Sequence, residues 1–156
     1  MTFKETRDWE LIKHIVTHPN IYPHVSDDFS PPPELWEPID SPAAHYVVVR
    51  DESTREEVLG LWAFYEHTPI VWNVHTCLLP AAYGQRARRA AKEMAKWIWA
   101  NTKCLRLVTE VPESNRLALR FARAAGMTEY GFNPQSYLKG GALSGVHLLG
   151  MSKERN

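Results

Sequence analysis

Cysteine is scarce in this sequence, with two residues in a chain of 156. Cys77 and Cys104 stand in apolar, strand-like contexts, and neither belongs to a C-x-x-C or Cys/His pattern with the spacing of zinc ligands. We interpret both as reduced thiols in the protein core. The sequence therefore offers neither a disulfide framework nor a metal site as the basis of its function.

Long apolar runs are also missing. No segment approaches the ~20 consecutive apolar residues that a membrane-spanning helix requires. The stretch 1–7 is polar and lacks the pattern of a secretory signal peptide. We therefore expect a protein that has no membrane partner and that is cytoplasmic, or else is delivered by something other than a secretion signal.

The chain has no excess charge of either sign, because 18 Lys and Arg residues balance 18 Asp and Glu residues. We therefore do not expect nucleic acid as a partner. The balance fails locally, since seven cations and a single acid, Glu93, lie between Gln85 and Arg106. This asymmetry predicts a local anion site, and a nucleic-acid-binding face made of the same cations is the weaker interpretation.

Hydrophobic periodicity predicts an ordered series of helices and strands in the first half of the chain. An amphipathic helix is expected over 6–17, a further helical turn near 20–26, and a proline-rich loop over 30–42. Three segments rich in β-branched and aromatic residues follow, with short turns between them. They predict an antiparallel meander of three strands at 45–50, 57–65 and 70–79.

The second half of the chain alternates helices with strands. An alanine-rich helix has an apolar stripe from Ala87 to Ile98, and a strand is expected over 104–111. Ser114 is expected to cap the next helix and Gly126 to end it. The last expected elements are strands at 127–132 and 146–152, with a glycine-rich loop at 139–145 between them.

The junction Leu78 to Met94 contains the first functional signal. A strand ends there at a proline, and a turn containing Gly84 leads directly into a basic helix. Unpaired N–H groups and the positive end of the dipole at a helix N-terminus bind phosphate well. The junction is therefore a candidate phosphate site, although a solvated basic helix face gives the same pattern. The cations that would assist binding are Arg86, Arg88 and Arg89.

The segment 111–131 contains the second signal, a strand followed by a capped helix and another strand. Its residues and the order of elements resemble the GNAT N-acetyltransferase superfamily, over roughly 46–151. In that family a helix after the phosphate-binding turn reads roughly N-x-x-A and ends several residues later at G-F. The residues at these offsets are Asn115, Ala118, Gly126 and Met127.

The resemblance implies a fold and a cofactor. The fold is α/β, with a central twisted mixed sheet of about six strands flanked by helices, and its central strands splay apart to hold acetyl-CoA. The length independently predicts one domain, residues 1–156. By resemblance, the backbone of Leu78 and Leu79 pairs with pantetheine, and Asn115 helps to fix the cofactor. The pyrophosphate would be bound by Gly84, Gln85, Arg86, Ala87, Arg88 and Arg89.

Two features depart from the family pattern. Arg86 and Arg88 stand where the phosphate-binding turn usually has small residues, and their side chains resist the close approach that glycine permits. Ala122 stands where many members have a tyrosine that protonates the departing thiolate of CoA. An alanine cannot donate a proton. Another donor or water is therefore required for catalysis, and Tyr130 and Tyr137 are the nearest replacements by sequence.

Acetyl transfer to an amine also needs a base. Strand alternation places His75 on one face of the 70–79 strand together with Asn73. The family's base often comes from this strand, so His75 is the first candidate. Glu110, near the end of the next strand, is the second, because partial burial there would raise its pKa. Glu66 is a weaker third candidate.

The sequence supports two functions. The first is acetyl-CoA-dependent transfer of an acetyl group to an amine, catalysed by His75, Glu110 and Tyr130; a small amine, an antibiotic and a protein N-terminus are alternative acceptors. The second is a GNAT-fold protein that has lost catalysis and serves as a binding or assembly module, which Arg88 and Ala122 favour. The chain also loosely resembles GNAT-like proteins of tailed bacteriophages, some with roles in virion assembly. Late strands commonly pair between subunits in the fold that the resemblance implies, so a homodimer is one alternative and the oligomeric state stays open.

Overall fold

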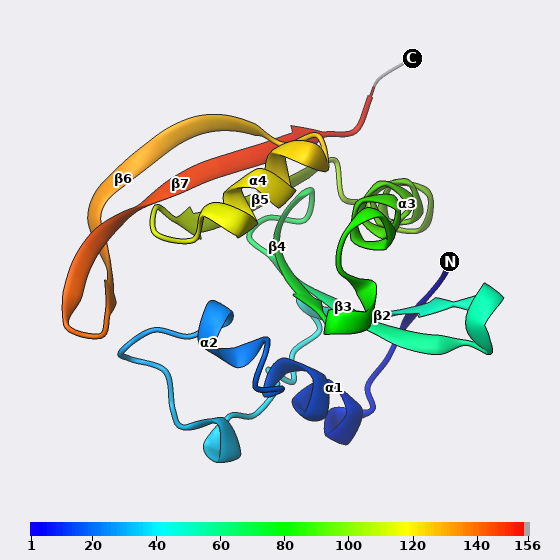
Figure 1. Cartoon of the computed structure of the whole chain (residues 1–156). Helices are drawn as coiled ribbons and strands as arrows, with labels where there is room; N and C mark the ends of the chain where they lie inside the picture. Colours follow the sequence, from blue (N-terminus) through cyan, green and yellow to red (C-terminus); the bar gives the residue numbers. More distant parts are fainter. Residues whose placement is uncertain (155–156) are drawn as a thin grey trace.

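The computed structural model describes residues 1–154, which form one sheet flanked by helices (Figure 1). The helices are α1 (Trp9–Val16), α2 (Tyr22–Val25), α3 (Gln85–Asn101) and α4 (Arg116–Ala124). The strands are β1 (Thr2–Glu5), β2 (Ala44–Asp51), β3 (Glu57–Glu66), β4 (Val71–Leu78), β5 (Arg106–Pro112), β6 (Thr128–Lys139) and β7 (Ala142–Ser152). These seven strands of the described chain lie in the order β1-β2-β3-β4-β5-β7-β6. The predicted α/β class with a mixed sheet is confirmed.

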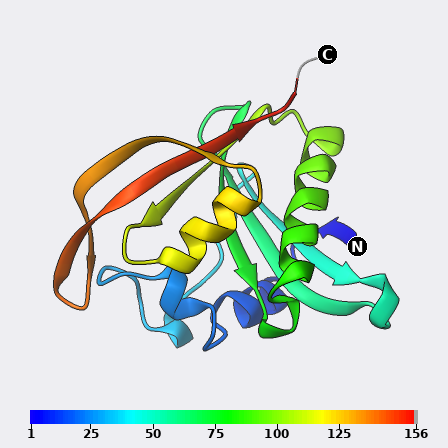
Figure 2. The same cartoon turned by 45° about the horizontal axis from the view of Figure 1, so that its top comes forward.

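Apolar layers cover both faces of the sheet. On one face, Met94 and Ile98 of α3 pack against Trp62 and other strand residues. On the other face, Ile12 and Ile15 of α1 pack against the same strands. α4 lies on the α3 side, over β5 and β7, while α2 lies with α1 (Figure 2). None of the described helices has the length and apolar character needed to cross a membrane.

The predicted meander is present as β2, β3 and β4, which pair antiparallel in sequence order. The side chains of successive residues pack on opposite faces of the sheet, because strand side chains alternate between faces. Val47 and Val49 face α3, whereas Tyr46 and Val48 face α1. Burial on both faces explains the near-continuous apolar runs of β2 and β3. β4 departs from this pattern, because His75 and Thr76 are exposed.

β4 and β5 separate soon after they meet. They run parallel and pair over three residues each, Val71–Asn73 with Arg106–Val108. Beyond these pairs β4 continues along β3 as far as Leu78, and β5 continues along β7 as far as Pro112. The two strands therefore diverge, and the sheet has a gap between their carboxyl ends.

Local structure differs from the predictions in three places. β1 was not predicted, and it adds an edge strand that pairs with β2. Asn115, not Ser114, caps α4, since its side chain accepts a hydrogen bond from the N–H of Ala118 at 3.1 Å. The predicted glycine-rich loop is a tight turn at Gly140 and Gly141, where two positive φ angles allow the β6 and β7 strands to extend close to the turn.

Candidate active site

The gap exposes one backbone edge of β4. Backbone groups of successive strand residues point to opposite edges. The carbonyl of Ile70 accepts hydrogen bonds from the N–H groups of Leu105 (2.8 Å) and Arg106 (3.0 Å), which lead into β5. The backbone groups of the even-numbered residues of β4 therefore point toward the β5 side. Thr76 and Leu78 are two of these even-numbered residues, and they lie past the last β4–β5 pair. Their N–H and C=O groups therefore face the gap, without a strand partner in the described residues.

The two leucines that were predicted to contact pantetheine point their backbone groups in opposite directions. The N–H of Leu79 donates to the carbonyl of Leu59 at 2.8 Å, which places it on the β3 side. The backbone of Leu78 faces the gap, while its side chain is buried in the core under α3. Of the two, Leu78 is the residue whose backbone is available to a ligand in the gap.

α3 begins shortly after β4 ends, with an open N-terminus. Its N-cap, Gly84, has φ 87°, and no side chain caps the first turn. A Cβ added to Gly84 would meet no described atom within 4 Å, so the space beside the turn is open. The side chain of Gln85 is exposed and that of Ala87 is buried. Both residues offer their first-turn N–H groups, at the positive end of a long helix dipole, to an anion.

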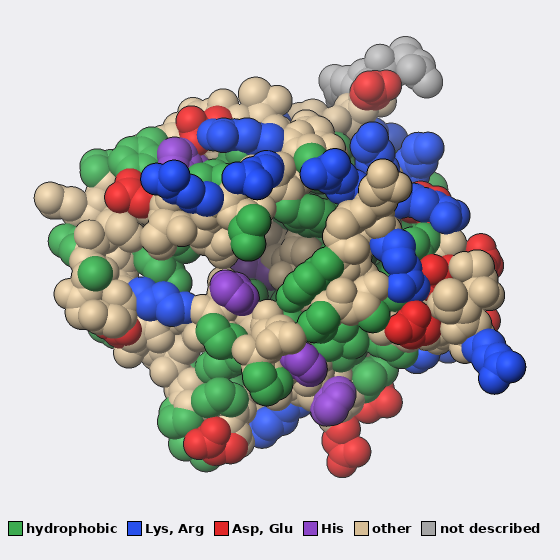
Figure 3. All heavy atoms as spheres, in the orientation of Figure 1, with side chains coloured by type: hydrophobic (Ala, Val, Ile, Leu, Met, Phe, Trp, Pro, Cys, Tyr) green, Lys and Arg blue, Asp and Glu red, His purple; other side chains and the backbone are tan. Residues whose placement is uncertain are grey.

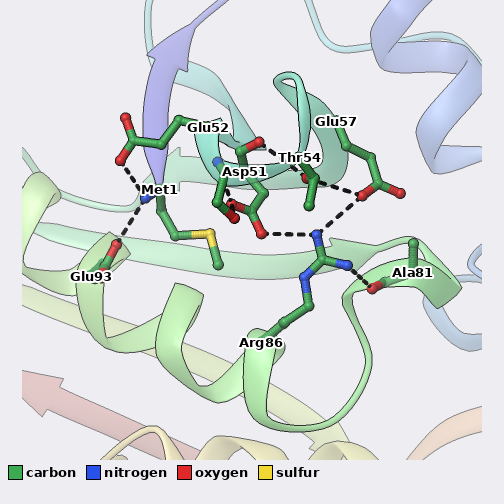
Figure 4. A network of polar contacts seen from close by, with 9 residues as sticks. Met1, Asp51, Glu52, Thr54, Glu57, Ala81, Arg86 and Glu93 are labelled. Atoms are coloured by element: carbon green, nitrogen blue, oxygen red, sulfur yellow. Dashed lines mark hydrogen bonds and ion pairs between the residues drawn. The ribbon is translucent and has the colours of Figure 1, made fainter.

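The Arg86 side chain extends to the turn between β2 and β3 (Figure 4). Its Nη2 lies 2.9 Å from Asp51 Oδ2 and 3.1 Å from Glu57 Oε2, and its Nη1 donates to the carbonyl of Ala81 at 2.6 Å. Hydrogen bonds from Ser53, and then from Arg86, lower the pKa of Asp51 to about 2. Arg86 therefore ties the beginning of α3 to the β2–β3 turn.

The other two arginines of the junction lie on the surface. Arg89 Nε donates to Glu93 Oε1 at 3.0 Å, one helical turn further along, and most of its side chain remains exposed. Arg88 is exposed and forms no ion pair with a described residue. Arg88 and Arg89 are therefore the cations that this junction offers to a bound anion.

A pocket of about 240 Å³ opens where β4 and β5 diverge. It contains both His75 and Glu110, which were selected separately from the sequence as candidate bases. His75 shares the strand face of Cys77, which packs in the α1 core, so it points to the side of the sheet that α1 and α2 cover. The lining residues are Tyr65, Asn73, Val74, His75, Thr109 and Glu110.

His75 is exposed at the pocket, and the Tyr65 ring lies beside its imidazole. Desolvation by this protein lowers the pKa of His75 below the ordinary histidine value. The neutral form therefore dominates at pH 7. A neutral imidazole that faces an open pocket can accept a proton from a ligand.

Tyr65 meets His75 edge-on, with their ring centroids 5.4 Å apart. The Tyr65 hydroxyl lies 3.4 Å from that of Tyr46, which in turn accepts the N–H of Ile39 at 2.8 Å. Burial, followed by the hydrogen bond with Tyr46, raises the pKa of Tyr65. Tyr65 therefore stays protonated and can orient groups by donating a hydrogen bond, but it is a poor acid.

Glu110 is exposed at the pocket, so the predicted partial burial of this carboxylate is wrong. It forms no ion pair with a described residue and is available to attract a cation. Glu66 lies elsewhere, with its carboxylate 2.9 Å from His45 Nε2 and 3.5 Å from Lys103 Nζ. The hydrogen bond with His45 is the main cause that lowers the pKa of Glu66. The structure therefore brings together His75 and Glu110, but not Glu66.

Tyr130 and Tyr137 lie outside the His75 pocket. Tyr130 lines a separate hollow of about 550 Å³, with the Arg106 guanidinium carbon 5.3 Å from its ring centroid. The Tyr137 hydroxyl donates to the carbonyl of Ser26 at 2.9 Å. The structure therefore does not bring either hydroxyl to His75.

α4 carries the two positions that were compared with the family motif. The Asn115 side chain is used as the helix cap, so its contribution to the gap is to fix where α4 begins. Ala122 is buried against Leu119 and Leu149. A methyl group in this core cannot donate a proton, so α4 provides no acid at this position.

Sequence reasoning did not select Tyr65, Asn73 or Thr109 as site residues. Tyr65 and Asn73 are direct partners across β3 and β4. Since strand alternation puts Asn73 on the face of His75, the register of this hairpin contained a signal for Tyr65 as well. Thr109 has no such signal, because its place in the pocket depends on where β5 leaves β4.

A mixed sheet that splits between two parallel strands, with a helix starting at the end of the first, defines the GNAT acetyltransferase fold. Solved structures show this fold for nearly the whole chain. The spermidine N-acetyltransferase from Vibrio cholerae, in complex with CoA and spermine, has a TM-score of 0.76 at 16% identity and covers 97% of this chain and 94% of that chain. A proposed phosphinothricin N-acetyltransferase has a TM-score of 0.74 at 19% identity and covers 99% of both chains.

A dodecameric structure of the Vibrio cholerae spermidine enzyme is similar over a smaller part, with a TM-score of 0.62 at 17% identity and coverage of 71% of this chain and 66% of that chain. No family model matches the sequence, and no curated protein matches it. At these identities the likeness establishes the GNAT fold, and the residues of the gap and pocket must support the function.

Proposed function

We propose that this protein is an N-acyltransferase that moves the acetyl group of acetyl-CoA to an amine. The observation that carries the proposal is the gap between β4 and β5, which has an open helix N-terminus beside it and a neutral histidine in its pocket. The similar structures are N-acetyltransferases, and one of them was solved with CoA and spermine. Both facts favour this reaction and this cofactor.

The residues around the gap fit the chemistry of CoA. The free backbone groups of Thr76 and Leu78 can pair with a chain that contains amides, such as pantetheine. The open first turn after Gly84 suits a pyrophosphate, and the exposed Arg88 and Arg89 add positive charge. When bound, acetyl-CoA supplies an acetyl group activated as a thioester.

In this proposal His75 is the base. An amine acceptor arrives as an ammonium ion and must lose a proton before it can attack. The carboxylate of Glu110 attracts the ammonium to the pocket, and the neutral imidazole of His75 accepts its proton. Because Ala122 offers no proton, water that enters the exposed pocket is the acid on the other side of the reaction.

The role of His75 can be tested by its pH dependence. We expect His75→Gln to lower kcat/KM by roughly 10²–10⁴-fold with little change in acetyl-CoA affinity. The wild-type rate should rise with pH through a pKa below about 6.5, because the base acts only after it loses its proton. Thiol release followed against pH measures both. A variant with the wild-type rate and pH profile would remove His75 from the mechanism.

Arg86 is assigned a positioning role, because its guanidinium is already held by Asp51, Glu57 and Ala81. Arg86→Ala should weaken acetyl-CoA binding by about tenfold through the turn, and Asp51→Asn should have a similar effect. The double variant should then be no weaker than the worse single variant. Fully additive losses would contradict this role.

Calorimetric titration with acetyl-CoA is the direct test of the function. Micromolar binding that Arg88→Ala and Arg89→Ala weaken, more strongly at low salt, is expected for a phosphate contact. Transfer to a panel of amines should then depend on His75. An absence of binding at millimolar acetyl-CoA would reject the proposal.

The buried Ala122 favours a second candidate function, a GNAT-fold protein that binds acetyl-CoA or another partner without transferring the acetyl group. Such a protein would act as a binding or assembly module. It would bind the cofactor in the titration yet release no thiol with any amine, whereas the transferase requires both.

A further inference from the structure

The tip of the β6–β7 hairpin is fastened to the segment that follows α2. The Asp28 carboxylate accepts hydrogen bonds from the N–H groups of Gly140 (2.7 Å) and Gly141 (2.9 Å). Both glycines have positive φ, which turns their N–H groups toward the same carboxylate. The N–H of Asp28 also donates to the carbonyl of Leu138 at 3.1 Å. Three hydrogen bonds with backbone groups of the hairpin thus meet at Asp28.

Two further side chains strengthen this attachment. Lys139 Nζ donates to the carbonyls of Pro23 and Ser26, the second at 2.9 Å, and the Tyr137 hydroxyl donates to the same Ser26 carbonyl at 2.9 Å. The hydrogen bonds from Gly141 and Gly140 lower the pKa of Asp28, so its carboxylate is ionised at neutral pH. We name these contacts between 23–28 and 137–141 the clasp.

The clasp closes a ring around the approach to the pocket. On one side of this ring, Glu110 of β5 pairs with Leu148 of β7, and β7 leads to the hairpin tip. The clasp joins the tip to α2, and the α1 and α2 core contacts Cys77 of β4, two residues from His75. Figure 1 shows the hairpin tip beside the α2 segment, and Figure 3 shows an opening between the hairpin and the N-terminal helices.

We propose that the clasp sets acceptor specificity, by confining the amine to an enclosed approach to His75 and Glu110. Slim, unbranched primary amines can enter, whereas branched amines and amines on folded proteins are excluded. The inference rests on the proposed transferase function. Asp28 does not line the pocket, so it acts through the hairpin and is a positioning residue.

Thiol labelling tests the enclosure without any need for catalysis. Asn73→Cys places a thiol in the pocket lining, while Cys77 and Cys104 are buried and desolvation raises their pKa values to about 12 and about 11, which keeps them unreactive. With the clasp intact, a maleimide on a bulky dye should react far more slowly than N-ethylmaleimide. Asp28→Ala should reduce this difference by roughly tenfold.

Two variants control the labelling test. Asp40→Ala removes another exposed carboxylate of the N-terminal loops, which forms no hydrogen bond or ion pair with the described hairpin residues, and it should leave the rate difference unchanged. If Asp28→Ala does not fold, Lys139→Ala opens the clasp from the hairpin side. Equal labelling rates for the two maleimides with the clasp intact would overturn the enclosure.

Selectivity between amines tests the consequence. Asp28→Ala should raise kcat/KM for a branched amine relative to a linear one by roughly tenfold, through KM rather than kcat. Asp28→Glu, which keeps the carboxylate, should restore part of the selectivity. Unchanged selectivity in an active Asp28→Ala enzyme overturns this proposal alone. A wild-type protein that neither binds acetyl-CoA nor transfers overturns the proposed function and the specificity role together.

Discussion

The two sides of the gap are built by different forces. β2 and β3 are buried on both faces along most of their length, with Trp62 and Phe64 almost fully enclosed, and β4 pairs with β3 beside them. The β6–β7 hairpin has an outer strand that is exposed along most of its length, and its tip is held by polar contacts at Asp28. Apolar packing therefore fixes the wall that would hold the cofactor, while hydrogen bonds fix the wall that the acceptor would pass. The position of the packed wall is therefore hard to alter by substitution, whereas a few substitutions can alter the position of the wall that hydrogen bonds hold.

The largest expected effect breaks the packed wall. Phe64 is 0% exposed and Phe132 of β6 is 45% exposed, so the same substitution can be made in both walls. Phe64→Ala should lower the free energy of unfolding by about 3–5 kcal/mol. Phe132→Ala should cost about 1 kcal/mol or less. Urea unfolding of both variants checks this, and equal losses would show that the hairpin is packed as firmly as the meander.

A smaller effect is expected from two glycines with positive φ. At Gly60 of β3 (φ 140°), a Cβ would lie 2.2 Å from the carbonyl oxygen of Cys77, so Gly60→Ala forces β3 and β4 apart and should cost roughly 3 kcal/mol. At Gly140 a Cβ meets no described atom within 4 Å, and Gly140→Ala should cost about 1 kcal/mol of backbone strain. Thermal unfolding of the pair gives the comparison. A more harmful change at Gly140 would contradict it.

The smallest effect concerns two carboxylates that hold turns, Asp51 beside α3 and Asp28 in the clasp. Each has a lowered pKa, so each contributes stability above the unfolded value of about 3.9 that is lost as pH falls toward its native value. For Asp51 this window extends down to about 2. Asp51→Asn should remove part of the acid sensitivity of global unfolding.

Asp28→Asn should instead act locally. It should raise hydrogen exchange at Gly140 and Gly141 while global stability changes little, because the clasp can open without unfolding the meander. A comparable loss of global stability in both Asn variants would show that the clasp belongs to the same cooperative unit as the packed wall.

The sequence predicted the packed wall better than the polar one. Strands β2 to β4 follow directly from β-branched and aromatic runs, because burial in a packed sheet favours such residues. β1 was missed because Thr2–Glu5 is short and mostly polar, so the strand depends on its pairing with β2 rather than on its own composition. The extension of β6 and β7 was missed because a Pro and several polar residues lie in strands that face solvent.

Some features of the candidate site could likewise be predicted from the sequence, and others could not. His75 and Glu110 could be selected one by one, since each lies on a strand near the expected gap. Their meeting in one pocket depends on how early β4 leaves β5, and no local pattern reports that. The acidic partners of Arg86 are 35 and 29 residues away, so its basic character suggested a phosphate contact where the structure places an ion pair.

The clasp also bears on the order in which the chain folds. The meander joins neighbours in sequence through short turns, so its loop-closure cost is small and it can form early. Asp28 must find Gly140 across 112 residues of chain. During synthesis the N-terminal half can therefore fold before the hairpin residues that bind Asp28 have been made. We expect the contact between Asp28 and the hairpin, which closes the ring around the pocket, to be among the last to form.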